Sequence, residues 1–81
     1  MKNINEFIDY INYQEYEIID SWNREYPIRE KHYVIFKNNK YFSLTFTSRY
    51  ILLYQIKNDI EIFICKRETF KEIIKEIDLC D

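Results

Sequence analysis

The 81-residue chain contains no glycine and no alanine, and it has one proline and one tryptophan. Without glycine, we expect neither a phosphate-binding glycine-rich loop nor the nucleophile elbow of a hydrolase. No apolar run reaches the roughly 18 residues that a membrane-spanning helix needs. The first residues, 1–6, lack the long apolar core of a signal peptide. We therefore expect a cytoplasmic protein with no membrane partner.

Metal ligands and catalytic groups are also few. The two cysteines, Cys65 and Cys80, have 14 residues between them, and the single histidine is His32. These groups do not have the spacing of a zinc site, and thiols in a cytoplasmic protein usually stay reduced. His32 lies in a predicted strand with no recognisable nucleophile motif around it. The sequence therefore predicts no enzyme activity, no metal and no cofactor.

The chain is instead rich in large apolar residues, with 15 isoleucines, eight tyrosines and six phenylalanines. An apolar content of 47% with a net charge of only −2 excludes intrinsic disorder. The length suits a single domain, residues 1–81. The charge is uneven, because residues 1–22 carry −4, residues 23–57 carry +5 and residues 58–81 carry −3. Acidic ends and a basic middle can steer a charged partner.

Two segments have the apolar periodicity of an amphipathic helix. The first stripe consists of Ile4, Phe7, Ile8 and Ile11, and the second consists of Phe70, Ile73, Ile74 and Ile77. Asn3 is expected to cap the first helix, with Glu6 at the reciprocal capping position. The second helix is expected to begin at Thr69, with Glu72 in the same relation to it.

The residues between these helices are typical of strands. Residues 16–22 predict a first strand, and residues 23–30, with Pro27 and four charges, predict a loop. Two hairpins are expected to follow, with strands 32–36 and 41–47 in the first and strands 50–56 and 60–66 in the second. Asn38 and Asn39 suit a tight type I′ turn, and residues 57–59 are expected to form the second turn.

A two-residue turn determines which side chains share a face of the sheet. In the first hairpin Phe36 would lie opposite Tyr41. One face would then hold Tyr33, Ile35, Phe42, Leu44, Phe46, Ile51, Leu53, Ile62 and Ile64, and we expect both helices to cover it. The other face would hold His32, Val34, Phe36, Tyr41, Ser43, Thr45, Tyr50, Leu52, Tyr54, Phe63 and Cys65. This face is too aromatic for plain exposure, which indicates further helices, self-association or a binding surface.

We predict that this second face contacts a protein partner. The expected binding residues are Phe36, Lys37, Lys40, Tyr41, Tyr54 and Phe63. Tyr41 is expected to be a hot spot, and the two lysines are expected to affect association rate and salt dependence. A homodimer formed through the same face is the competing interpretation.

The charge pattern supports two further interpretations. Basic Arg24, Arg29, Lys31, Lys37, Lys40 and Arg49 are interleaved with Tyr26, Tyr33, Phe36 and Tyr41, a pattern that can bind RNA or DNA through phosphate contacts and base stacking. Acidic Asp9, Glu15, Glu17, Asp20, Glu72, Glu76, Asp78 and Asp81 could instead mimic nucleic acid toward a basic groove. In the last helix, Glu72 and Lys75 alternate in sign as in an ordinary solvated helix.

The opening residues Asn3-Ile4-Asn5-Glu6-Phe7-Ile8, followed by Ile11 and Tyr16, resemble the start of small prophage-encoded anti-CRISPR proteins that inhibit Cas9. The resemblance covers about 16 of the 81 residues and does not extend past Trp22. It implies a short helix leading into an antiparallel sheet, closing helices, and a non-catalytic inhibitor that occupies a surface of a CRISPR effector. The basic middle of this chain departs from the strongly acidic character of the resembled protein.

The predicted fold is α+β, with a four- to five-stranded antiparallel sheet and an N-terminal and a C-terminal helix packed on one face. The predicted function is a non-catalytic protein-binding module of the anti-defence inhibitor type. The alternative is a small RNA- or DNA-binding protein that uses the basic, tyrosine-rich middle.

Overall fold

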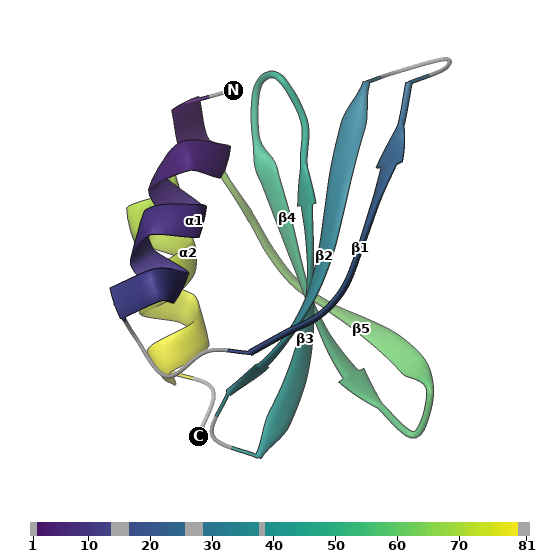
Figure 1. Ribbon diagram of the computed structural model, residues 1–81. Helices are drawn as coiled ribbons and strands as arrows, with labels where there is room; N and C mark the ends of the chain where they lie inside the picture. Colours follow the sequence, from purple (N-terminus) through teal and green to yellow (C-terminus); the bar gives the residue numbers. More distant parts are fainter. Residues whose placement is uncertain (1, 14–16, 26–28, 38, 80–81) are drawn as a thin grey trace.

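The computed structural model describes residues 2–13, 17–25, 29–37 and 39–79. In chain order its elements are α1 (Lys2–Tyr13), β1 (Glu17–Arg24), β2 (Glu30–Lys37), β3 (Lys40–Phe46), β4 (Ile51–Lys57), β5 (Ile60–Arg67) and α2 (Phe70–Leu79). The strands form one antiparallel sheet in the order β1-β2-β3-β4-β5. Both helices lie on the same side of this twisted sheet (Figure 1). The predicted α+β class is confirmed.

Element boundaries differ from the prediction at two places. α1 begins at Lys2, so Asn3 lies inside the helix and not at its cap. β1 and β2 extend into the predicted loop because Arg24 and Glu30 pair across the hairpin. The predictions made for Glu15, Tyr16, Tyr26, Pro27, Asn38, Cys80 and Asp81, and for the side chain of Ile11, lie outside the described residues.

The start of α2 has the predicted cap. The backbone N–H of Glu72 donates to Oγ1 of Thr69 at 3.4 Å, and the Thr69 hydroxyl donates to Oε1 of Glu72 at 2.8 Å. The Thr69 side chain thereby satisfies one of the backbone donors that every helix leaves open in its first turn.

Both tight turns have two residues, and the second is one residue shorter than the predicted turn over 57–59 because Lys57 belongs to β4. Lys37 pairs with Lys40 and Lys57 pairs with Ile60, so each hairpin closes around a two-residue loop. Asn39 has a φ of 62°, and residues 58–59 have φ values of 51° and 64°. Asparagine and aspartate tolerate this left-handed region better than other non-glycine residues, which explains their use in a chain without glycine.

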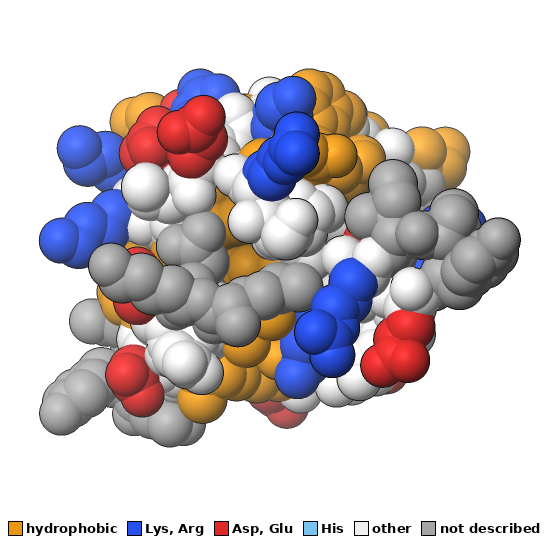
Figure 2. Space-filling model, turned by 90° about the horizontal axis from the view of Figure 1, so that it is seen from above, with side chains coloured by type: hydrophobic (Ala, Val, Ile, Leu, Met, Phe, Trp, Pro, Cys, Tyr) orange, Lys and Arg blue, Asp and Glu red, His pale blue; other side chains and the backbone are white. Residues whose placement is uncertain are grey.

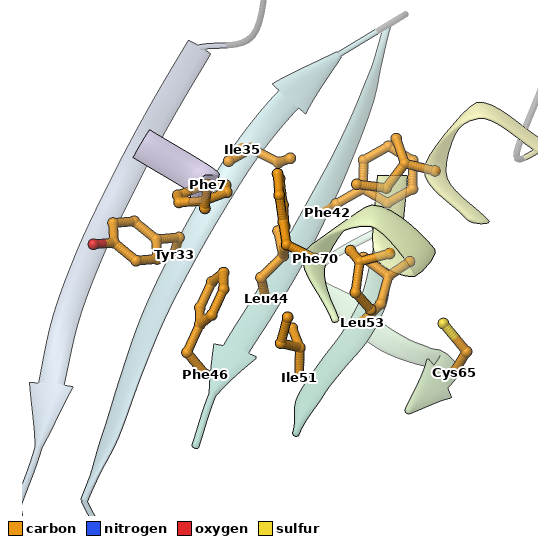
Figure 3. Close-up of a cluster of buried hydrophobic side chains, with 12 residues drawn as sticks. Phe7, Tyr33, Ile35, Phe42, Leu44, Phe46, Ile51, Leu53, Cys65 and Phe70 are labelled. Carbon is orange, nitrogen blue, oxygen red and sulfur yellow. The ribbon is translucent and has the colours of Figure 1, made fainter. Parts of the chain in front are cut away.

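The core lies between the helices and the sheet (Figure 3). Phe7 of α1 is fully buried, with ring centroids 4.6 Å from Tyr33, 5.2 Å from Phe46 and 5.3 Å from Phe70. The other buried apolar residues are Ile35, Phe42, Leu44, Ile51, Leu53, Cys65, Ile73 and Ile77. Ile4, Ile8, Ile64 and Ile74 are partly buried against this cluster. The predicted helix stripes therefore do face the sheet.

Each edge strand contains a β-bulge, and one of them overturns a predicted face. In β5 the pairing changes from Leu53 with Cys65 to Tyr54 with Phe63, so Ile64 is the extra residue. Cys65 therefore packs in the core beside Leu53, although simple alternation had placed it on the opposite face. In β1 the extra residue is Ile19, and bulges at sheet edges discourage pairing with another chain.

Candidate functional site

The open face is the side of the sheet turned away from the two helices (Figure 1). The strand register places on it the uncharged side chains of Trp22, His32, Val34, Phe36, Tyr41, Ser43, Thr45, Leu52, Tyr54, Ile56 and Phe63. The four predicted aromatic contact residues are all on this face, and neither helix covers them. The placement follows from the two-residue turns, whose register puts Phe36 opposite Tyr41 and Tyr54 opposite Phe63.

Four of these aromatic side chains form two cross-strand pairs. The rings of Phe36 and Tyr41 are 4.8 Å apart between centroids, and those of Tyr54 and Phe63 are 5.6 Å apart and edge-to-face. Tyr41 is 45% exposed and Phe63 is 55% exposed, while Phe36 and Tyr54 are half-buried. Such pairs hold large apolar rings in fixed positions, which reduces the conformational entropy lost on binding.

The two predicted lysines do not lie with these aromatics. Lys37 and Lys40 pair with each other one step beyond Phe36 and Tyr41, which puts them on the helix side of the sheet. Lys37 Nζ is 2.8 Å from Oδ1 of Asp78 near the end of α2. Lys37 thus connects the first hairpin to α2, and neither lysine belongs to the open face.

A second cluster on the open face was not predicted from the sequence. The indole of Trp22 is stacked on the imidazole of His32, with centroids 4.8 Å apart and planes inclined by 2°. The Glu30 carboxylate accepts from Nε2 of His32 at 2.9 Å, and Nδ1 lies 3.0 Å from the Thr45 hydroxyl. Because a carboxylate only accepts, Nε2 donates a proton to Glu30, and the second ring nitrogen is bonded to the Thr45 hydroxyl.

This cluster orients Trp22 on the open face. The imidazole is bonded at both nitrogens and covered on one side by an indole that remains 44% exposed. An acid, an imidazole and a hydroxyl in a row resemble a nucleophilic triad, but the Thr45 side chain is buried and its residue is only 6% exposed. Within the described ranges, no three His, Cys, Asp or Glu side chains are grouped to hold a metal ion.

The charges on the open face are predominantly negative. The register places acidic Glu17, Asp20, Glu30 and Glu61 and basic Arg24 and Lys66 on this face, which gives four negative and two positive groups and a net charge of −2. Its apolar centre and acidic margin complement a surface that is apolar and basic. A polyanion such as a nucleic-acid backbone would be repelled.

The chain has no match among protein-family models, curated proteins or solved structures. None of the helices in the described part of the chain is both long and apolar enough to cross a membrane.

Proposed function

We propose that this protein is a non-catalytic protein-binding module whose open face docks onto an apolar, basic surface of a partner protein. The observation that carries the proposal is the uncovered aromatic face, with Tyr41, Phe63 and Trp22 each about half exposed. Aromatic residues held in place before binding are the usual hot spots of protein interfaces. Contiguous apolar patches of this kind are uncommon on monomers that bind nothing.

The structure gives less support to RNA or DNA binding through the basic middle. Lys31 lies near the start of β2 and Lys37 at its end, about 20 Å apart at the rise of an extended strand. Lys37 and Lys40 flank one end of the sheet, whereas Arg24 and Arg29 flank the other. The bases are therefore divided between two ends, and the aromatic face between them is acidic.

Within the class of protein-binding modules, we propose an anti-defence inhibitor that acts by occupying a surface of its target. The resemblance of the first helix to anti-CRISPR proteins names a CRISPR effector as the first target to test. Nuclease activity of a purified Cas9 effector on a target plasmid, measured with and without this protein, tests that assignment. Unchanged cleavage would contradict the anti-CRISPR assignment. It would not contradict docking through the open face, because another partner protein could bind there.

The docking proposal is tested by affinity capture with matched variants. Immobilised wild-type protein, Phe63→Ala and Ile60→Ala are each exposed to nuclease-treated bacterial lysate, and proteins captured by wild type are identified. Phe63 and Ile60 are both exposed apolar residues of β5, but Ile60 is on the helix side of the sheet. Truncating either side chain should leave the fold intact.

The affinity of the purified partner then decides the result. We expect Phe63→Ala or Tyr41→Ala to weaken binding by about 30-fold, the loss typical of a hot spot, and Ile60→Ala to change it less than about twofold. Equal affinities for wild type, Tyr41→Ala and Phe63→Ala would place the contact elsewhere. A partner that wild type captures from untreated lysate but not from nuclease-treated lysate would favour nucleic-acid binding.

A further inference from the structure

We infer that the end of the β1–β2 hairpin carries a separate binding site for a small phosphorylated ligand. A cavity of about 290 Å³ lies there, between the first turn of α1 and the adjoining ends of β1 and β2. It is lined by Ile4, Asn5, Asn23, Arg24, Glu25, Arg29, Glu30 and Lys31. Figure 2 looks onto this end of the molecule, where several Lys and Arg side chains are visible.

The lining groups have the chemistry that binds a tetrahedral anion. Arg24, Arg29 and Lys31 supply three positive charges, and Asn5 and Asn23 add side-chain amides that can donate hydrogen bonds. Arginine binds phosphate oxygens with two parallel hydrogen bonds, and the three terminal oxygens of a phosphoryl group can accept from both arginines at once. This cavity therefore gives Arg29 and Lys31, which the register does not place on the open face, a role separate from docking.

The lining contains three bases and two carboxylates, Glu25 and Glu30, which leaves a net charge of +1. Of the two carboxylates in the lining, Glu30 accepts the hydrogen bond from Nε2 of His32 at 2.9 Å, which holds its charge toward the open face. Among the described residues, Arg29 has no ion-pair partner. The cavity is at the small end of the range for ligand sites, which suits a phosphate monoester and not a folded protein.

A second cavity lacks these properties, although it also contains bases. It is lined by Arg49, Tyr50, Lys66, Arg67 and Glu68. Lys66 Nζ lies 4.6 Å from the ring centroid of Tyr50, and Arg67 bonds Glu76 at 3.1 Å. Lys31 of the first cavity likewise lies 5.6 Å from the ring centroid of Tyr33, so the difference between the two cavities is that the second has no side-chain amide in its lining.

Inorganic phosphate is the probe for the proposed site. Backbone amide shifts of the ¹⁵N-labelled protein are followed as phosphate replaces chloride at constant ionic strength. We expect saturable shifts confined to the residues that line the cavity, and affinity reduced about tenfold in Arg29→Ala. Lys57→Ala removes an exposed base at the opposite end of the sheet and should bind phosphate like the wild type.

Three results would overturn the inference, and none of them bears on the docking face. They are shifts that do not saturate, shifts spread over all exposed bases, and equal phosphate affinity in Arg29→Ala and wild type.

Two short oligonucleotides, one with a 5′-phosphate and one without, identify the source of the phosphoryl group. Binding of only the phosphorylated strand supports a nucleic-acid end, and binding of neither supports a free small molecule. Equal binding of both strands would show backbone binding and contradict a site for one phosphoryl group.

Discussion

Replacing Phe7 by alanine should remove much of the stability of this domain. Phe7 is the one fully buried side chain among those described in α1, and its ring meets Tyr33, Phe46 and Phe70 at centroid distances of 4.6 to 5.3 Å. Truncating a buried phenylalanine costs about 3–5 kcal/mol. A small domain has a total stability of about 5–15 kcal/mol, and 81 residues place this one toward the lower part of that range.

Urea unfolding measures this loss, with far-UV circular dichroism and the fluorescence of Trp22 as two probes. Ile8→Ala is the matched control, because Ile8 is on the same helix but only partly buried, and it should cost about 1–2 kcal/mol. Equal midpoints for Phe7→Ala and Ile8→Ala would refute the packing of α1 on the sheet. If Phe7→Ala shifts only the dichroism curve, α1 unfolds separately from the sheet.

Three smaller changes test local features. Thr69→Ala should lower the free energy of unfolding by about 1 kcal/mol because Thr69 caps α2, and chemical denaturation would show no change if the cap were unimportant. Asp59→Gly should raise stability by about 0.5–1 kcal/mol, since residue 59 has a φ of 64° in the second turn, and a lower melting temperature would contradict this geometry. His32→Ala should lower the free energy of unfolding by about 1–3 kcal/mol, because Glu30 and Thr45 lose their hydrogen bonds to the imidazole. It should also change the fluorescence of Trp22, and an unchanged emission spectrum would argue against the stacked pair.

The turns and the open-face aromatics could be predicted from sequence because their physical causes are local. Asparagine-rich two-residue turns set the register of both hairpins, and strict alternation then assigned Phe36 and Tyr41 to one face. The same alternation assigns Lys37 and Lys40 to the other face. The two lysines were predicted to lie beside the aromatic residues because they are adjacent to Phe36 and Tyr41 in the sequence. Adjacent residues of a strand face opposite sides of the sheet, so the prediction was wrong for both lysines.

The bulges could not be predicted, and they account for the misplaced face of Cys65 and for the missed Trp22–His32 stack. Because Ile64 is an extra residue in β5, the residues after it face the side of the sheet opposite to the one that simple alternation predicts. Apolar residues occur at both odd and even positions of β5, so its sequence does not reveal the shift. Cys65 was misplaced for this reason. The Trp22–His32 stack also lies beyond a bulge, at Ile19. The pairing of Trp22 with His32 depends on this bulge, and the apolar pattern of β1 does not show where the bulge lies.

The central claim is that the open face docks a partner protein, and fluorine NMR of the protein labelled with 3-fluorotyrosine tests it most directly. Tyr41 and Tyr54 lie on the open face, whereas Tyr33 is buried beneath the helices and serves as an internal reference. When the captured partner is added, we predict that the Tyr41 and Tyr54 resonances shift or broaden and that the Tyr33 resonance does not. Binding that leaves Tyr41 and Tyr54 unchanged would contradict docking through this face.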